Sequence, residues 1–314
     1  MPRHITLCVV ASRPAGPGVR RLTLRDPDGY PLPRVKPGAH LDLAVPDVGM
    51  RAYSLCGDPA VGDRWEIAVK REAASRGGSA WLHDGVTVGD QLAASMPRCT
   101  FPIVDGAARH VMIAGGIGVT PFLAMAPVLE RAAADWVLHV LYRGGPPPCP
   151  DDLAPWIAAG RAVPHDTLAV PRPALALLLG GHTPGLQAYC CGPEAMLDAF
   201  EQATADWPDG AARVEHFVPP ALPPDPAARP YTLALAASGS TIDIPAGGSM
   251  LEGLRALGAK VESSCEGGIC GACEVRWLDG APLHRDRVLS PARRATHLLS
   301  CVAGCASGRL VVEA

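Results

Sequence analysis

The chain has 314 residues, which is long for one domain and comfortable for two or three. It is 48% hydrophobic with a net charge of −3, so a soluble globular protein is expected, and no basic stripe suggests a nucleic-acid partner. No run approaches the roughly 18 apolar residues of a membrane helix, and the apolar start is too short for a signal peptide. A cytoplasmic protein that contacts no membrane is therefore expected.

Residues 1–106 read as short strands separated by turn residues. His40–Val45 and Trp65–Val69 alternate cleanly between apolar and polar residues, and Val19–Leu24 does so over its last three residues. Clusters such as Asp26–Gly29 mark the turns between them. This pattern predicts a small antiparallel β-barrel.

Two motifs in this first part point to anion binding. Arg51-Ala52-Tyr53-Ser54 combines an arginine, which can bind a phosphate through two hydrogen bonds, with the flat face and hydroxyl of a tyrosine. Arg76-Gly77-Gly78-Ser79 is a second loop able to cradle an anion. Taken alone, the first motif is explained more simply as a barrel edge that carries a surface charge.

Residues 107–217 alternate between strands and helices. The strand Val111–Ala114 runs into the glycine turn Gly115–Pro121, and a helical stretch continues to Arg131. Strands follow at Val137–Tyr142 and at Gln187–Cys190, the latter leading into Cys191-Gly192-Pro193. This alternation predicts an α/β domain with a parallel sheet. The glycine turn allows a backbone to approach a pyrophosphate, but it is not the G-x-G-x-x-G pattern, and ordinary turn chemistry remains the alternative.

A proline-rich stretch, Val218–Pro230, is predicted to be a semi-rigid linker, because it can hold neither a helix nor a central strand. Residues 231–314 then predict an α+β domain. Its expected elements are a hairpin, a short helix and a closing strand, at Tyr231–Ala236 with Thr241–Ile244, at Met250–Leu257 and at Leu310–Val312.

Four of the eleven cysteines have a diagnostic spacing. Cys265, Cys270, Cys273 and Cys301 fit C-x4-C-x2-C…C, the plant-type ferredoxin spacing for a [2Fe–2S] cluster. A structural zinc site is the alternative, although zinc usually uses two C-x2-4-C units and only one is present. Cys305 is expected to be an ordinary thiol.

Glycines accompany these cysteines. Positive φ is expected at Gly267, Gly268 and Gly271, because it would turn backbone N–H groups toward the cluster sulfurs.

In this order, the motifs resemble the phthalate dioxygenase reductase family over essentially the whole chain, and vanillate demethylase reductases are similar relatives. The resemblance implies an FMN barrel (1–106), a nicotinamide domain (107–217), the linker (218–230) and a ferredoxin domain (231–314). It implies that FMN is bound by Arg51, Ala52, Tyr53, Ser54, Ala68, Val69, Lys70, Gly77, Gly78 and Ser79, with Thr120 reaching the flavin. It implies that the nicotinamide nucleotide is bound by Gly115, Gly116, Gly118, Cys191, Gly192 and Pro193.

One position departs from the family. Relatives carry a further Phe shortly after the His-Phe pair that precedes the linker, whereas here His216-Phe217 runs into Val218 and prolines. The role of that Phe is either absent or taken by Phe217. NADH is expected rather than NADPH, because Arg143 is the one basic residue beyond the strand where a 2′-phosphate would bind, and relatives that use NADH retain an arginine there.

The expected function is electron transfer. A nicotinamide delivers two electrons as hydride and a [2Fe–2S] cluster accepts one, so a flavin between them is needed to divide the pair. The resemblance names a terminal Rieske-type oxygenase as the acceptor. A stand-alone oxidoreductase with its own organic substrate is the alternative, but no motif suggests a substrate site with acid–base groups. A redox sensor would not need both flavin and nicotinamide sites.

Overall fold

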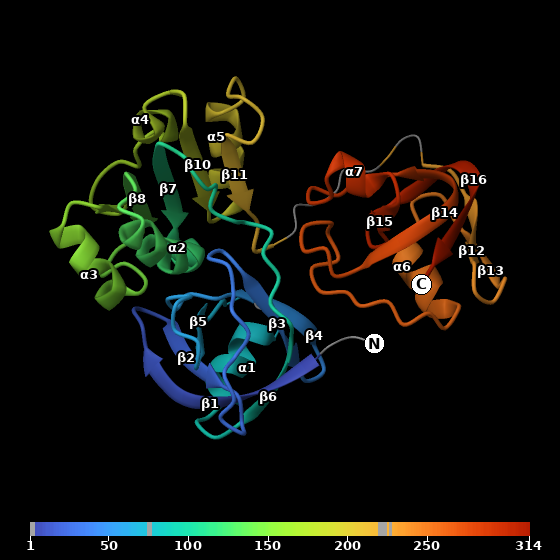
Figure 1. The fold of residues 1–314 in the computed structure, drawn as a ribbon, viewed down its shortest axis with the longest axis horizontal. Coiled ribbons are helices and arrows are strands. Elements are labelled where there is room, and N and C mark those ends of the chain that lie inside the picture. The colour runs from blue at the N-terminus through green and yellow to red at the C-terminus, as the bar shows by residue number, and fades with distance from the viewer. Residues whose placement is uncertain (1–3, 74–76, 219–224, 226–227) are drawn as a thin grey trace. The chain divides into compact units, whose positions relative to one another are not determined.

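The computed structural model describes residues 4–73, 77–218, 225 and 228–314, and the chain separates into two compact units, Met1–Phe217 and Val218–Ala314 (Figure 1). Arg76 and much of the predicted linker lie outside the described residues.

The first unit begins with an antiparallel sheet of strand order β4-β3-β6-β1-β2-β5. A bridge between Leu55 and Ile67 joins the two edges of this sheet, so that it closes into a barrel. Leucines such as Leu22 and Leu41 alternate inward and fill its core. The elements of this part are β1 (His4–Pro14), β2 (Val19–Arg25), β3 (His40–Val45), β4 (Gly49–Ser54), β5 (Trp65–Lys70), α1 (Gly78–Asp84) and β6 (Gln91–Ser95).

The rest of the first unit is a parallel sheet of order β11-β10-β7-β8-β9 with helices on both faces (Figure 1). Leu123 of α2 and Leu153 of α3 pack on one face, whereas Leu175 of α4 and Phe200 of α5 pack on the other. The elements are β7 (Arg109–Gly115), η1 (Gly116–Val119), α2 (Thr120–Arg131), β8 (Trp136–Tyr142), α3 (Pro150–Ala158), β9 (Ala162–Asp166), α4 (Leu175–Leu179), β10 (Leu186–Cys191), α5 (Glu194–Ala203) and β11 (Ala212–Glu215).

The barrel and the parallel sheet share one hydrophobic core. Val19 and Ala68 of the barrel belong to the same buried cluster as Val119, Phe122 and Leu153 of the α/β part. Because protein interiors are packed as densely as crystals, this shared core holds the two parts in a defined arrangement.

The second unit is a mixed sheet of order β13-β12-β16-β14-β15, in which β12 and β16 are parallel. Leu254 of α6 packs into a core with Leu233 and Leu310. The elements are β12 (Tyr231–Leu235), β13 (Thr241–Ile244), α6 (Met250–Ala256), β14 (Glu274–Leu283), α7 (Pro291–Arg294), β15 (His297–Leu299) and β16 (Gly304–Glu313).

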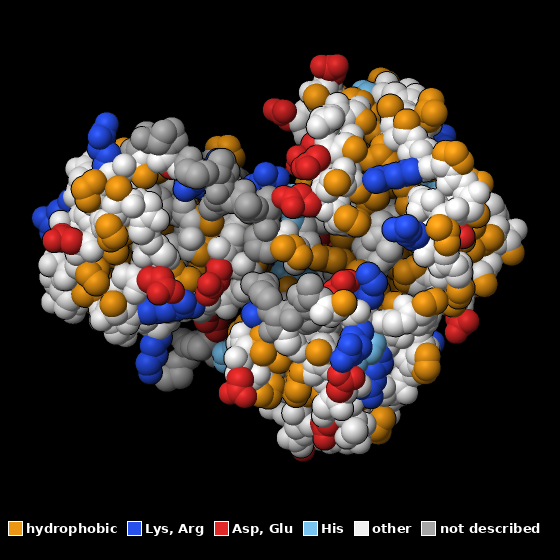
Figure 2. Space-filling model, turned by 180° about the vertical axis from the view of Figure 1, so that it is seen from behind, with side chains coloured by type: hydrophobic (Ala, Val, Ile, Leu, Met, Phe, Trp, Pro, Cys, Tyr) orange, Lys and Arg blue, Asp and Glu red, His pale blue; other side chains and the backbone are white. Residues whose placement is uncertain are grey.

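The fold class predicted from the sequence is confirmed: an antiparallel barrel, a parallel α/β sheet and an α+β unit. The closing strand, expected at Leu310–Val312, runs from Gly304 to Glu313. Within the described residues, no helix has the length and apolar character needed to cross a membrane. On the face drawn in Figure 2, acidic, basic and apolar side chains are interspersed, consistent with the small net charge.

Candidate functional site: a buried acid between two sheets, and four paired thiols

Three side chains meet where the barrel faces the parallel sheet. Ser54, the last residue of β4, donates its hydroxyl hydrogen to Glu215 Oε2 over 3.5 Å. Cys191, the last residue of β10, donates its thiol hydrogen to the same oxygen over 3.8 Å. Glu215 itself ends β11, which is paired with β10 so that Glu215 lies beside Cys191. Residues far apart in the chain therefore converge at the carboxyl end of the parallel sheet, where open α/β sheets bind their ligands.

Glu215 is the unusual member of this group. It is buried, and burial raises its pKa to about 8, while the hydrogen bonds from Cys191 and Ser54 lower it to a smaller extent. At neutral pH this carboxyl group is therefore mostly protonated. Sequence reasoning missed Glu215, because a single acid at the end of a short strand has no motif of its own. Only its place beside Cys191 and Ser54 identifies it.

The glycines of the predicted pyrophosphate turn have two different roles. A Cβ on Gly118 would lie 2.2 Å from the carbonyl oxygen of Cys191, and one on Gly115 would lie 2.6 Å from Pro193. These glycines therefore let the turn after β7 pack directly against Cys191-Gly192-Pro193. Gly116 differs, because its φ is +55° and a Cβ there would meet nothing within 4 Å. Among these three, Gly116 is the one whose backbone is open to a ligand.

The barrel brings its two anion motifs together. A Cβ on Gly78 would lie 3.0 Å from both the Arg51 side chain and the Tyr53 hydroxyl oxygen. Gly77 has a φ of +103° and precedes α1. The Tyr53 phenol is largely buried, and burial raises its pKa to about 12, with Arg51 acting in the opposite direction. Arg51, Tyr53 and Gly78 thus form one compact group that fits a phosphate and an adjoining flat ring.

The other residues predicted to bind the flavin have different surroundings. Ala68 lies in the core shared with Cys191, whereas Val69 packs inside the barrel and Lys70 pairs with Glu72 at 3.0 Å. The Ala52 side chain is exposed. The Ser79 hydroxyl accepts a hydrogen bond from the backbone of Glu72. Thr120 is buried and donates its hydroxyl hydrogen to the carbonyl of Ile117 over 3.1 Å, at the start of α2. Of these residues, Ala68 is the one that belongs to the same buried cluster as Cys191.

The four predicted cluster ligands lie in the second unit as two pairs of thiols. Cys265 hydrogen-bonds with Cys270, and Cys273 hydrogen-bonds with Cys301. Among the residues described, no three His, Cys, Asp or Glu side chains are spaced to hold one metal ion. Two pairs suit a [2Fe–2S] cluster, in which each of two irons takes two thiolates, better than a single zinc ion.

The backbone around these thiols also fits a cluster. The N–H of Gly267 points at Cys265 Sγ over 3.4 Å, and the backbone of Gly268 hydrogen-bonds to the Cys301 thiol. Such N–H groups stabilise negative charge on sulfur. Positive φ occurs at Gly268 and Gly271 as expected, but the expectation for Gly267 was wrong, because the neighbouring Glu266 takes the left-handed conformation with a φ of 53°.

Cys305 lies elsewhere. Its buried thiol contacts the carbonyl of Arg309 at 3.3 Å and belongs to the main core of the second unit, whereas Cys273 and Cys301 share a separate small cluster.

Comparison with known proteins agrees with this arrangement. The family model for the 2Fe-2S iron–sulfur cluster binding domain matches residues 234–305. The chain is 40% identical over 280 residues to the heme-dependent oxidative N-demethylase beta subunit of Ectopseudomonas mendocina, covering 88% of each chain. It is 36% identical to phthalate dioxygenase reductase of Burkholderia cepacia, covering 92% of this chain and 91% of that one.

Two solved structures match nearly the whole chain. Phthalate dioxygenase reductase, described as a modular structure for electron transfer from pyridine nucleotides to [2Fe-2S], matches with a TM-score of 0.72 and 33% identity, over 99% of this chain and 98% of that one. An intact type IV self-sufficient cytochrome P450 monooxygenase matches with a TM-score of 0.91 and 36% identity; this chain is covered to 99% and corresponds to 41% of that protein.

Proposed function

Because the chain belongs to the phthalate dioxygenase reductase family and is a flavin- and [2Fe–2S]-dependent reductase component of an oxygenase system, we propose that it carries electrons from NADH to a Rieske-type oxygenase. The observation that supports this most is the coexistence in one chain of the Ser54–Glu215–Cys191 junction and the four paired thiols. One part suits hydride chemistry and the other suits release of single electrons. In this proposal, residues 1–106 bind FMN, 107–217 bind NADH and 231–314 hold the cluster.

When bound, the flavin and the cluster together convert the electron pair of NADH into single electrons. The residues of the chain bind and orient these groups. Arg51 and Gly78 would hold the flavin phosphate, Tyr53 would bind the flavin, and Gly116 would bind the pyrophosphate of NADH. The buried Ser54 and Cys191 would lie beside the nicotinamide and the flavin, and the Glu215 carboxyl group would keep that place polar without a full negative charge. The burial of these side chains would keep water out of the junction, which limits side reactions there.

The turn after β8 supports NADH as the donor. Asp166, the last residue of β9, accepts a hydrogen bond from the backbone N–H of Gly144 over 2.7 Å, next to Arg143. A carboxylate near a strand end can bind a ribose 2′-hydroxyl but repels a 2′-phosphate. Sequence reasoning considered Arg143 alone and missed this acid.

A heme-containing acceptor is the second candidate. It is supported by the relative named as the beta subunit of a heme-dependent demethylase and by the cytochrome P450 monooxygenase that contains a region like this chain. In both cases the electron exit is expected at the second unit, and the acceptor differs.

Reconstitution distinguishes these acceptors. The full-length protein, loaded with FMN and cluster, is mixed anaerobically with NADH and either a purified Rieske-type dioxygenase or a purified heme-dependent demethylase. We expect rapid bleaching of the Rieske centre, with NADH favoured over NADPH. Faster reduction of the heme would support the second candidate. Reduction of a small quinone, with neither oxygenase reduced, would indicate a stand-alone oxidoreductase.

A further inference from the structure

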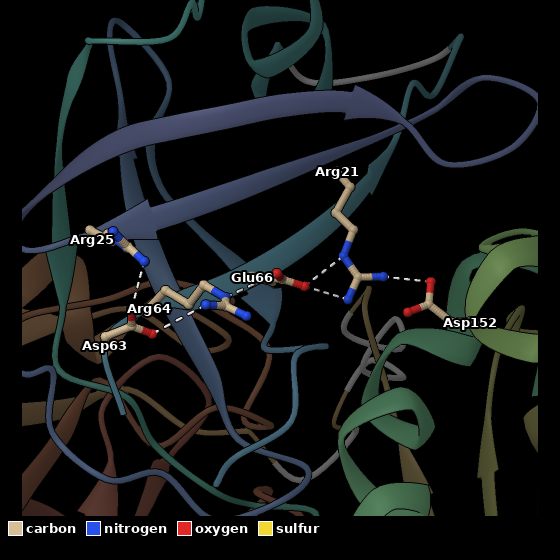
Figure 3. Close-up of polar contacts among 6 residues, drawn as sticks. All are labelled: Arg21, Arg25, Asp63, Arg64, Glu66 and Asp152. Atoms are coloured by element: carbon tan, nitrogen blue, oxygen red, sulfur yellow. Dashed lines mark hydrogen bonds and ion pairs between the residues drawn. The ribbon is translucent and has the colours of Figure 1, made fainter. Parts of the chain in front are cut away.

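One buried guanidinium joins the flavin barrel to the nicotinamide part of the first unit. Arg21 on β2 has only 5% of its side chain exposed. Its Nε and Nη2 atoms donate to Glu66 Oε2 on β5 over 2.8 and 2.5 Å, and its Nη1 donates to Asp152 Oδ2 on α3 over 2.5 Å. Figure 3 shows Arg21 between these two carboxylates, one from each part. A buried charge is stable only when it is paired and hydrogen-bonded, so these contacts restrict where α3 can lie.

The ionic network continues within the barrel. Arg64 Nε lies 3.6 Å from Glu66 Oε1, and Asp63 bridges Arg64 to Arg25 (Figure 3). The charges of three arginines and three carboxylates therefore balance. Glu66 is contacted by Arg21 at Oε2 and by Arg64 at Oε1. This leaves Arg21 with little freedom to follow a displaced Asp152.

The barrel end of this contact lies on a proposed flavin strand. Arg21 is paired in register with Ala68, the residue of β5 that lies in the core shared with Cys191. Glu66 precedes Ala68 by two residues on β5, so both side chains point to the same side of that strand. A shift of Arg21 or Glu66 is therefore transmitted directly to the strand beside the flavin.

The other end of the contact lies where the loop after β8 docks on the barrel. Asp152 is in the first turn of α3, just after Cys149. The N–H of Cys149 donates to the carbonyl of Ala15 over 2.7 Å. A Cβ on Gly16 would be 3.3 Å from the carbonyl oxygen of Pro147, so the loop and the barrel turn are in close contact. This loop begins at Arg143, beside the proposed NADH ribose site.

From this geometry, we propose that Arg21 is a positioning residue which, through Glu66 and Asp152, sets the separation between the nicotinamide and the flavin for hydride transfer. Hydride transfer requires the reacting atoms to be about 3–3.5 Å apart, and a displacement of about 1 Å can cost a hundredfold in rate. In this proposal, Arg21 and its partners act on geometry and not on the reacting atoms. The inference rests on the proposed transfer from NADH to flavin.

The chain provides a matched control. Arg131 on α2 donates to both oxygens of Asp58 on the barrel, over 2.7 and 2.9 Å, and so also joins the two parts. This pair is far more exposed, with 48% and 33% of the side chains accessible. Exposed ion pairs contribute little. Asp58→Asn and Asp152→Asn therefore remove the same charge from two contacts between the same parts that differ in burial.

The test uses full-length protein loaded with FMN and cluster, and compares the limiting rate of flavin reduction at saturating NADH and with 4-deuterated NADH. We expect Asp152→Asn to lower the limiting rate by about tenfold to a hundredfold and to change the deuterium isotope effect. Flavin content should be retained, and the dissociation constant for NADH should change much less. Arg21→Lys should be slowed in the same way, since an ammonium cannot reproduce the forked contact of the guanidinium. Asp58→Asn should react like wild type.

Hydrogen exchange provides a second measurement that does not depend on activity. Protection of the Cys149 amide reports whether the loop is docked on Ala15, and it should fall in Asp152→Asn but not in Asp58→Asn.

A wild-type limiting rate and isotope effect in Asp152→Asn would overturn the proposal, even if exchange were faster, because the contact would then be structural only. If NADH fails to reduce the flavin of the wild type, the proposed function fails, and unchanged exchange in Asp152→Asn would overturn the positioning role separately.

Discussion

The Ser54 hydroxyl and the Glu215 carboxyl group lie 3.5 Å apart although 161 positions separate them in the chain. This contact joins the last residue of a barrel strand to the last residue of the parallel sheet. Since Cys191 contacts the same oxygen of this carboxyl group, Glu215 connects a barrel strand with the centre of the parallel sheet.

Replacing Glu215 with glutamine should change how stability depends on pH. The pKa of Glu215 is raised from 4.5 to about 8 by burial, so between these values the folded state binds a proton that the unfolded state has lost. Wild-type stability should therefore fall as pH rises through this range, by on the order of 4 kcal/mol from this residue. Urea unfolding at pH 5 and pH 8.5 measures this, and Glu215→Gln should be the more stable protein at pH 8.5 only.

The exposed Glu130 on α2 provides the control for this experiment. Glu130→Gln should shift the unfolding free energy by nearly the same small amount at both pH values. Equal shifts at pH 5 and pH 8.5 in Glu215→Gln would contradict the raised pKa.

Gly118→Ala should destabilise the first unit. Its new Cβ would be placed 2.2 Å from the carbonyl oxygen of Cys191 and 2.9 Å from the nitrogen of Gly192, and backbone atoms cannot move aside cheaply. The expected loss is about 3 kcal/mol or more. Gly116→Ala meets open space and suffers only the left-handed backbone, at about 1–2 kcal/mol. Urea unfolding of both variants tests this order, and a larger loss for Gly116→Ala would contradict the packing role of Gly118.

Much of the fold could be predicted because its signals are local. The alternation of His40–Val45 predicted β3 to the residue, and the apolar run Val137–Tyr142 differs from β8 by one position. The two central features of the junction could not be predicted in this way. Glu215 is identified as a site residue only by its burial against Ser54 and Cys191. Arg21 is identified as a link between the two parts only by its ion pair with a residue of α3. Both depend on how two sheets pack, which no periodicity within one segment encodes.

The glycine turn at Gly115–Pro121 shows a different limit of prediction from sequence. Its composition pointed to a pyrophosphate, yet Gly115 and Gly118 are required by contact with Pro193 and Cys191, and only Gly116 remains open. A glycine in a sequence reports that space or an unusual φ is needed, but it does not say what occupies the space.

The identity of the fourth cluster ligand can be tested by two serine substitutions. Cys301→Ser should abolish the visible absorption and the reduced-state EPR signal of the cluster, because Cys301 is paired with Cys273 beside the loop that carries Gly268. Cys305→Ser should leave both signals, since its thiol lies in the main core of the second unit. Loss of the signals in Cys305→Ser, with Cys301→Ser intact, would show that the assignment is reversed.

A chain ending at Phe217 should fold, bind FMN and reduce ferricyanide with NADH. The reason is that the cores do not cross this position: Val19, Phe122 and Leu175 belong to clusters confined to the first unit, and Leu233 to one confined to the second. Glu215 and its contacts with Ser54 and Cys191 are retained. The measurements are flavin content, thermal unfolding and NADH–ferricyanide reduction, each compared with the full-length protein.

The same truncated protein should fail to support an oxygenase, because the four thiols of the cluster lie beyond residue 217. Adding back residues 218–314 as a separate chain loaded with cluster should restore little activity, since electrons would then depend on collision rather than on a tether. Loss of flavin from the truncated protein would show that residues 218–314 complete the flavin site. Undiminished support of an oxygenase would be the more serious contradiction, because the electrons would then leave from the flavin and the cluster would not be their exit.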